Sequence, residues 1–269
     1  LFRSFQLNNH NVEFAREHTH LVRGMNHYLY LKVAARNSRR SSCDLENRPR
    51  MPNNASFETA AASCEAAHYA YNFIKKVRLQ RGQNAIVNGA GGAIGSALVQ
   101  ILKYYELSVT AVCSTDQMDK VRALGADRIV DYTKQDFTEG TTRYSIVFDA
   151  VGKSRFKLCR RILEPRGIYM SSELGPAAEN LWLPLFTIAS KQKVIFPLPS
   201  DIPDSLKFIT ELIESGRFTP LIDRTYPLEA IADAFAYVNS GQKTGNVMVR
   251  FPLSGHAVST PLHELAKSK

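Results

Sequence analysis

Hydrophobic positions between residues 51 and 251 follow two different periods. From Phe57 to Ile74, apolar side chains recur every three or four residues, which predicts a helix with one buried face, capped by Ser56. After Gly82, short apolar runs alternate with helical patterns. The predicted strands cover residues 84–88, 108–113, 128–131, 145–149, 168–172 and 193–197. The predicted helices between them cover residues 93–104, 116–124 and 154–163, the second with Asp116 as its N-cap and Gly125 just past its end.

Strands that alternate with helices at this spacing imply right-handed crossovers and a parallel sheet. We therefore expect an α/β fold built on a doubly wound, Rossmann-type sheet. The closing part differs, with predicted helices at 206–214 and 228–238, an extended segment at 221–226 and a final strand at 247–251. Residues 1–50 show no sustained period apart from a strand-like run at 29–33, and residues 252–269 are expected to form a flexible tail.

Composition supports an ordinary globular protein. The chain has 269 residues, of which 44% are hydrophobic and 22% charged, and this excludes disordered and collagen-like chains. No apolar run approaches the roughly 18 residues of a membrane-spanning helix, so we expect no membrane partner. The four cysteines form no CxxC pair, which is typical of a reduced, cytoplasmic protein.

The net charge of +9 is unevenly distributed. Residues 1–50 hold nine basic and four acidic side chains, while the 200 residues that follow are close to neutral. A nucleic-acid-binding protein usually carries its basic residues on one face of a folded element. We therefore expect no nucleic-acid partner.

The glycine-rich run after the first predicted strand is the most informative motif. It fits a variant of the GxGxxG pattern, with Ala90 for the tight turn, Gly92 for close approach to a pyrophosphate and Gly95 for packing of helix on strand. Free N–H groups at the helix start would bind the phosphates. The alternative is a tightly packed connection that binds nothing. The candidate pyrophosphate contacts are Ala90, Gly91, Gly92, Ala93, Ile94 and Gly95.

The end of the second predicted strand bears on the choice of cofactor. NAD-binding proteins usually place an acid about 20 residues past the glycine motif, where it holds the ribose 2′-hydroxyl. That count reaches Thr115, and the strand end carries no acid. Ser114 and Thr115 leave room for a 2′-phosphate, and Lys120 or Arg122 would add positive charge. We therefore favour NADP(H) over NAD(H).

Taken together, the motifs of residues 51–251 resemble the cofactor-binding half of the medium-chain dehydrogenase/reductase superfamily, most closely its zinc-independent, quinone-oxidoreductase-like branch. The match runs through Ser56-Phe57-Glu58-Thr59-Ala60-Ala61, the glycine turn, Leu124-Gly125-Ala126-Asp127 with Val130-Asp131-Tyr132, Phe148-Asp149-Ala150-Val151-Gly152, Asp223-Arg224-x-Tyr226-Pro227-Leu228 and Gly241-x-Lys243-x-Gly245-Asn246-Val247. Arg166 departs from the usual glycine of a Pro-Gly-Gly turn.

The resemblance implies hydride transfer from NADPH to a quinone, enone or carbonyl substrate, a small molecule, without catalytic zinc. It assigns no catalytic acid or base. Lys243 lies in a predicted loop, where a lysine is usually solvated. The resemblance implies instead that Lys243 is a candidate phosphate or ribose contact. The further cofactor contacts that it implies are Ala150, Val151, Gly152, Glu173, Leu174 and Asn246.

The same resemblance divides the chain. Residues 1–74 would be a truncated or divergent remnant of a GroES-like, mostly β catalytic lobe plus the leading helix, so the second lobe is reduced. Residues 75–193 would be the NADP-binding Rossmann core, 194–251 its last strand and helix with the return to the catalytic lobe, and 252–269 the tail. Because this lobe is short, the alternative function is a nucleotide-binding remnant without turnover.

Several residues keep two interpretations. His18 and His20 could share one strand face as metal ligands or be exposed polar residues, and Tyr28 and Tyr30 could donate protons or pack. Cys113 is expected to be a buried thiol. The resemblance also implies a homodimer that pairs residues 193–198 edge to edge. A pocket, a dimer edge or plain core are the alternatives for Trp182, Leu183, Phe186 and Phe196.

Overall fold

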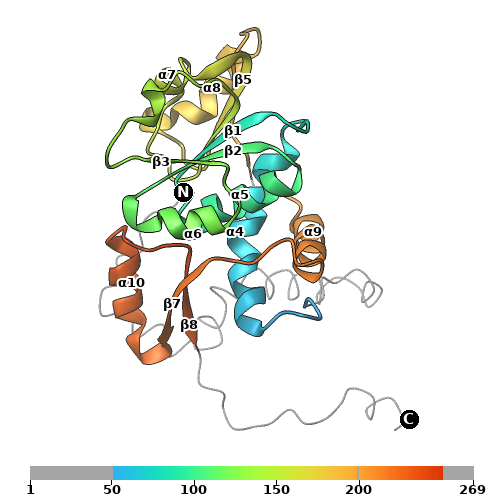
Figure 1. Ribbon diagram of the computed structural model, residues 1–269, viewed down its shortest axis with the longest axis vertical. Coiled ribbons are helices and arrows are strands. Elements are labelled where there is room, and N and C mark those ends of the chain that lie inside the picture. Colours follow the sequence, from blue (N-terminus) through green and yellow to red (C-terminus); the bar gives the residue numbers. More distant parts are fainter. Residues whose placement is uncertain (1–50, 199, 251–269) are drawn as a thin grey trace, which may run out of the picture.

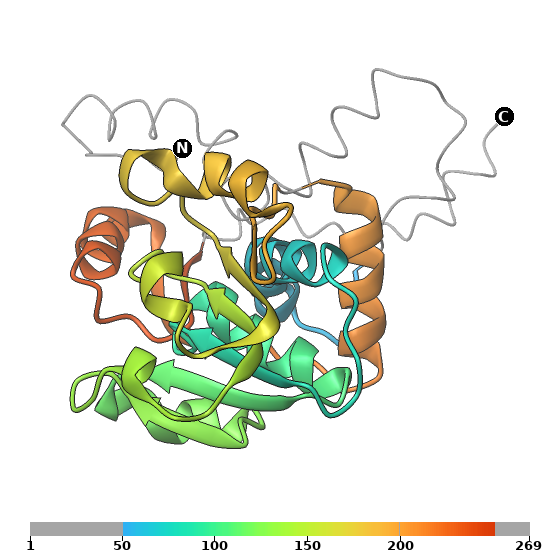
Figure 2. The same ribbon diagram turned by 90° about the horizontal axis from the view of Figure 1, so that it is seen from above.

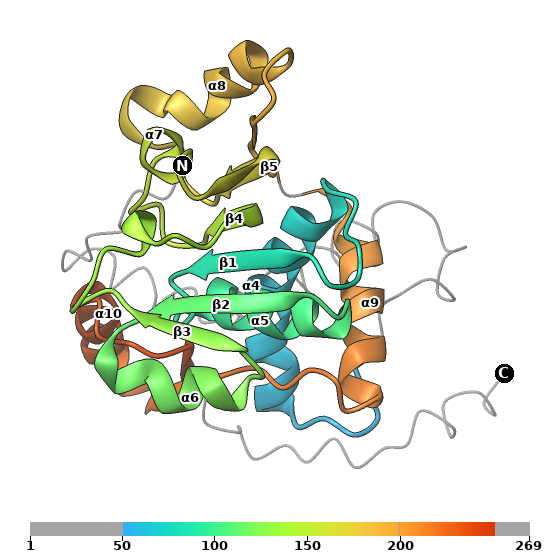
Figure 3. The same ribbon diagram turned by 45° about the horizontal axis from the view of Figure 1, so that its top comes forward.

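A parallel sheet of six strands forms the centre of the protein. The computed structural model describes residues 51–198 and 200–250. The strands are β1 (Asn84–Asn88), β2 (Ser108–Cys113), β3 (Arg128–Asp131), β4 (Tyr144–Asp149), β5 (Leu163–Ser171) and β6 (Lys193–Ile195). They lie in the order β3-β2-β1-β4-β5-β6, and Figure 3 shows the first five of these in sequence. The order reverses direction between β1 and β4, so the predicted doubly wound α/β fold is confirmed.

Helices cover both faces of this sheet. The α-helices are α4 (Phe57–Lys75), α5 (Ala93–Tyr104), α6 (Met118–Ala123), α7 (Phe156–Cys159), α8 (Glu179–Thr187), α9 (Ile202–Glu214) and α10 (Ile231–Asn239). Short 3-10 helices are η1 (Thr115–Gln117), η2 (Phe137–Glu139), η3 (Pro176–Ala178) and η4 (Leu228–Ala230). Figure 2 shows α9 alongside α4, and α7 and α8 lie at the opposite end of the molecule from α10 in Figure 1. Within the described ranges, no helix is both long and apolar enough to cross a membrane.

The two faces of the sheet carry separate apolar cores. Successive strand residues point to opposite faces, so Ala85 and Val87 pack with α4, α5 and α9, while Ile86 packs with α7. The rings of Phe73 and Phe148 meet edge to face at 5.8 Å in the larger core. Burial of one such side chain contributes about 1.5–3 kcal/mol to folding. The sheet is thus held from both sides, as parallel sheets generally are.

A second, two-stranded sheet follows. Its strands β7 (Ile222–Pro227) and β8 (Asn246–Arg250) pair in parallel, and α10 lies between them in the chain. A single bridge between Gly92 and Gly245 joins this unit to the start of α5. The closing part of the chain therefore returns to the glycine turn.

Several predicted boundaries are wrong. The helix expected at 154–163 shrinks to α7, because Leu163 pairs with Tyr144 and already belongs to β5. The helix expected at 116–124 is split into η1 and α6, and its N-cap is Ser114 rather than Asp116. The helix expected at 206–214 starts at Ile202, because Asp201 caps it with its side chain. The helix α8 was not expected at all.

A buried polar cluster joins α4 to α9. Nδ1 of His68 lies 2.6 Å from Oγ of Ser205, whose hydroxyl donates to the carbonyl of Ile202 at 2.8 Å. The backbone N–H of Ser200 donates to Oδ1 of Asn72, and Nδ2 of Asn72 lies 3.3 Å from Nε2 of His68. These partners suit a neutral imidazole that carries its proton on Nδ1. A second proton on Nε2 would face the amide N–H groups of Asn72.

We predict that His68 makes the fold sensitive to mild acid. Burial lowers the pKa of His68, and the charge of Asp201 acts in the opposite direction. Because the folded pKa lies below the unfolded one, the stability that neutral His68 contributes is complete above about pH 6.5 and is lost as the pH falls below that value. In urea titrations, the free energy of unfolding should fall more steeply from about pH 7.5 to about pH 5 in the unsubstituted chain than in His68→Gln. Equal slopes would contradict this role.

Candidate nucleotide-binding site

The glycine turn brings α5 against the end of β1. Gly89 has φ +81°, and the side chain of Val151 packs directly over it. A Cβ at Gly95 would overlap the carbonyl oxygen of Gly89 and the Cα of Ala90. Only glycine therefore fits at Gly95, which confirms that this position serves the packing of helix on strand.

The first turn of α5 presents free donors. Gly92 is the N-cap residue and caps with no side chain, and the first helical bond runs from Ser96 N to Gly92 O. Among the described hydrogen bonds, none uses the N–H groups of Ala93, Ile94 or Gly95. A Cβ at Gly92 would meet only the Gly89 oxygen, at 3.3 Å, within the described part of the chain. These donors, with the positive end of the helix dipole, suit a pyrophosphate.

The predicted adenosine-phosphate residues lie together at the end of β2, but their hydroxyls are engaged. Oγ of Ser114 accepts from the N–H of Gln117, whose side chain in turn accepts from Ser114 N at 3.4 Å. The hydroxyl of Thr115 donates to the carboxylate of Asp131. Hydrogen bonds from Thr115 and Thr133 hold the pKa of Asp131 down at about 2. The only hydroxyl proton of Thr115 is thus taken.

Two residues at this end escaped the sequence reasoning. The side chain of Gln117 lies against Gly91, where a Cβ would overlap it, and its Nε2 donates to Lys243 O at 3.2 Å. A carboxylate oxygen of Asp223 lies 3.8 Å from Nζ of Lys120. The Ser-x-x-Gln spacing of a capping box was a usable signal for Gln117. The contact between Lys120 and Asp223 joins distant segments and left no local signal.

The segment from Lys243 to Asn246 lies on the glycine turn. Gly245 N donates to Gly91 O at 2.7 Å, and Nζ of Lys243 donates to Gly245 O at 2.9 Å. Burial lowers the pKa of Lys243, and the charge of Asp223 opposes the shift. Lys243 is therefore not the solvated loop lysine of the alternative interpretation. The side chain of Asn246 instead donates to Leu221 O at 3.0 Å, which orders the start of β8.

A wholly buried carboxylate organises the other half of the site. Asp149, the last residue of β4, accepts from Asn88 Nδ2 at 3.0 Å, Ser154 N at 2.8 Å and the Tyr169 hydroxyl at 3.2 Å. These bonds link the ends of β1, β4 and β5. They also fix the path of the residues from Ala150 to Gly152, which were expected at the nicotinamide.

The residues after β5 meet that loop. The side chain of Glu173 packs over Gly152, where a Cβ would overlap it. Glu173 O accepts from Asn180 Nδ2 at 2.8 Å, and the N–H of Asn180 donates to Leu174 O at 3.0 Å. Burial raises the pKa of Tyr69 on α4, and the charges of Glu65 and Glu173 add to the shift. Tyr69 is a further titratable group near this end that the sequence did not single out.

Two buried polar atoms here have no hydrogen-bond partner within the described structure. They are Oγ of Ser172 and Oδ1 of Asn180, both in the segment that follows β5. An unpaired buried group costs about 1–3 kcal/mol, so such atoms commonly mark a place where water or a ligand binds. Their position at the carboxyl edge of the sheet fits the amide-bearing end of a nicotinamide cofactor.

The start of α8 is strained and clamped. Ala177 and Ala178 have φ of 50° and 55°, a left-handed conformation that costs about 1–3 kcal/mol per residue. The guanidinium of Arg155 forms two hydrogen bonds with the carboxylate of Glu179, at 2.9 and 2.6 Å. This bidentate pair ties α8 to the segment after β4 and holds the strained turn in place.

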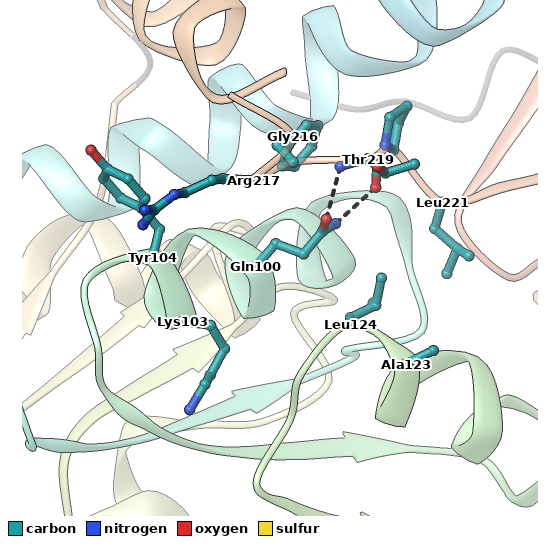
Figure 4. A pocket seen from close by; sticks show the side chains of 11 residues that line it. Gln100, Lys103, Tyr104, Ala123, Leu124, Gly216, Arg217, Thr219 and Leu221 are labelled. Carbon is teal, nitrogen blue, oxygen red and sulfur yellow. Dashed lines mark hydrogen bonds between the residues drawn. The ribbon is translucent and has the colours of Figure 1, made fainter. Parts of the chain in front are cut away.

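A pocket among the described residues lies elsewhere. It is a groove of about 560 Å³ at the carboxyl end of α5, where Gln100 bonds both N and O of Thr219 and Arg217 stacks on Tyr104 (Figure 4). Because α5 has 12 residues, it is about 18 Å long. The groove therefore lies at the opposite edge of the sheet from the free amides and is not part of the predicted site.

Some of the remaining expectations concern residues that the structure describes, and others concern residues outside the described ranges. Cys113 is fully buried and burial raises its pKa to about 11, which confirms the buried thiol. Trp182 and Phe186 are exposed, so the interpretation of these two as plain core is wrong. The strand-like run at 29–33, the paired histidines and tyrosines of the head, and the tail at 252–269 lie outside the described residues.

Comparison with known proteins identifies relatives of the described part. The model of a family described as zinc-binding dehydrogenase matches residues 124–249. The NADPH-dependent alkenal/one oxidoreductase of Arabidopsis thaliana, a chloroplastic protein by name, is 32% identical over 205 residues, 74% of this chain and 48% of its own. The 2-methylene-furan-3-one reductase of Solanum lycopersicum is 28% identical over 204 residues, with the same coverage of 74% and 48%. The chain thus spans about half the length of these curated relatives.

Solved structures agree on the fold. The quinone oxidoreductase from Coxiella burnetii superposes with a TM-score of 0.66 at 19% identity, covering 73% of this chain and 62% of that one. At this identity the likeness shows the fold alone. The family model, the related oxidoreductases and the glycine turn with its closing segment lead to one conclusion. The comparisons support the medium-chain dehydrogenase/reductase superfamily, and within it the quinone-oxidoreductase-like branch, as the family of this chain.

Proposed function

We propose that the chain is an NADP(H)-dependent oxidoreductase that transfers a hydride to an enone, quinone or carbonyl substrate without catalytic zinc. The observation that carries the proposal is the set of free amides at the start of α5, bordered by the glycine turn and by the segment from Lys243 to Gly245. The names of the relatives, an alkenal/one oxidoreductase and a furanone reductase, support this substrate class. The absence of zinc is inferred from the sequence, which has no four-cysteine lobe.

Each part of the site has a role in this proposal. The amides from Ala93 to Gly95 bind the pyrophosphate, and Lys120 faces the adenosine phosphate at the end of β2. The loop after Asp149 and the segment at Glu173 border the nicotinamide. The bound cofactor supplies the hydride, while the protein orients it and keeps water away. The alternative function is nucleotide binding without turnover.

We predict that the full chain binds NADPH, and binds NADH more weakly, with turnover of an activated alkene or a quinone. Binding can be followed by titrating the intrinsic fluorescence. Oxidation can be followed by the absorbance of the reduced cofactor after an enone or a quinone is added. Binding of a nucleotide without oxidation of the reduced cofactor would support the alternative function, nucleotide binding without turnover. Binding of neither nucleotide would rule out both functions.

We predict that Gly92→Val abolishes dinucleotide binding but leaves the fold intact. Gly92 has φ −80° and ψ 173°, a conformation that valine adopts readily, while the added methyl groups would block approach to the α5 amides. Gly140→Val is the matched control, because Gly140 also has ordinary φ and its Cβ would meet only Phe137 O at 3.7 Å. Unchanged affinity in a folded Gly92→Val protein would disprove the placement of the pyrophosphate.

We also propose that the chain forms a homodimer through the face made by α8 and β6. Leu185, Phe186 and Ile188 are 69%, 75% and 70% exposed, and among the described strands β6 forms an unpaired edge of the sheet. Exposed apolar side chains beside an open sheet edge are characteristic of protein interfaces. The face joins the segment at 193–198 that the family resemblance singled out.

We predict that Leu185→Ser with Phe186→Ser converts the dimer to a monomer in sedimentation velocity runs. The matched control is Phe57→Ser, which removes a side chain that is 77% exposed at the far start of α4. The control should remain dimeric. A monomeric unsubstituted chain, or a double variant that still dimerises, would contradict the proposal.

A further inference from the structure

Asp223 is a nearly buried carboxylate beside the adenosine end of the site. Its side chain is 10% exposed. Oδ2 accepts from the Tyr237 hydroxyl at 2.7 Å and from the N–H of Thr244 at 2.9 Å. Oδ1 points instead to Lys120, whose Nζ lies 3.8 Å away. One oxygen thus anchors the closing segment and the other faces the cation expected to meet a 2′-phosphate.

The carboxylate is charged at neutral pH. Burial pushes its pKa up, but the bonds from Tyr237 and Thr244 and the charges of Lys120 and Arg224 outweigh burial, and the net pKa lies below the ordinary value. The negative charge next to Lys120 is therefore permanent under working conditions.

Two further cations near the ends of β2 and β3, Arg122 and Lys134, are also paired with acids. Arg122 bonds Asp119 at 2.8 Å, and Lys134 lies 3.5 Å from Asp131. A 2′-phosphate carries close to two negative charges, and it gains most where positive charge is in surplus. Here Lys120, Arg122 and Lys134 each already have a carboxylate partner before the cofactor arrives.

We propose that Asp223 sets the cofactor selectivity of the chain by competing with the 2′-phosphate for Lys120. This competition narrows the preference for NADPH over NADH. This inference rests on the dinucleotide site of the proposed function. The carboxylate repels the 2′-phosphate and holds the ammonium group that would bind it. NADH, which carries a hydroxyl at that position, does not experience this competition.

The test compares dissociation constants for NADPH and NADH in the full-length chain and in Asp223→Asn. Asparagine keeps an acceptor oxygen for Tyr237 and Thr244 but removes the charge. The ratio of the NADH to the NADPH dissociation constant should rise about fivefold, which is the effect expected for the loss of one half-exposed ion pair. This rise should be smaller at high salt. The matched control is Asp233→Asn, which removes the same charge from an exposed position on α10 and should leave the ratio unchanged.

Lys120→Gln provides a second test, and its measurement in the otherwise unsubstituted chain does not depend on the folding of the Asp223 variant. Because the charge of Lys120 is already shared, its loss alone should reduce the NADPH preference by at most about threefold. In the Asp223→Asn background the same change should reduce it by about tenfold or more, because the two sites are coupled. If the role of Asp223 were purely structural, Asp223→Asn would weaken the binding of both nucleotides equally.

The outcomes separate this inference from the function on which it rests. An unchanged ratio in folded Asp223→Asn, an equal rise in Asp233→Asn, or a tenfold loss in Lys120→Gln alone would overturn the role of Asp223 and leave the function standing. Binding of neither nucleotide by the unsubstituted chain would overturn the function and this inference with it.

Discussion

No side chain fits where α5 crosses the end of β1. A single Cβ at Gly95 would overlap the Gly89 carbonyl, so the helix lies against the strand with only backbone between them. That contact aims the free amides of α5 at the carboxyl edge of the sheet and exposes Gly91 O to Gly245. Through Gly245, the segment that holds the half-buried Lys243 is attached to this turn.

The two halves of the site are organised by different means. On the side proposed for the nicotinamide, buried Asp149 accepts hydrogen bonds from β1, from β5 and from the segment after β4, and so fixes the ends of these strands in a buried environment. On the adenosine side, charges are paired near the surface, where water and salt weaken each interaction. We therefore expect the first half to be fixed by packing and the second to be the half in which specificity can change at little cost in stability.

Much of this arrangement can be read from the sequence, and the limits have physical causes. Gly89 to Gly95 and the strands around them carry strong local patterns, so the fold and the turn were predictable. The strand start at Leu163 depends on pairing with Tyr144, and the Thr115 hydroxyl is taken by Asp131 from a neighbouring strand. The helix α8 lacks a side-chain cap and contains Pro184, so tertiary contacts rather than propensity define it.

The clamp between Arg155 and Glu179 has a mechanical consequence. Two hydrogen bonds in one plane resist rotation as well as separation, so α8 cannot turn without moving the segment that follows β4. The outward apolar surface of α8 and the loop at Val151 and Gly152 are therefore expected to move together. Any contact that covers the outer surface of α8 is therefore expected to restrain that loop as well.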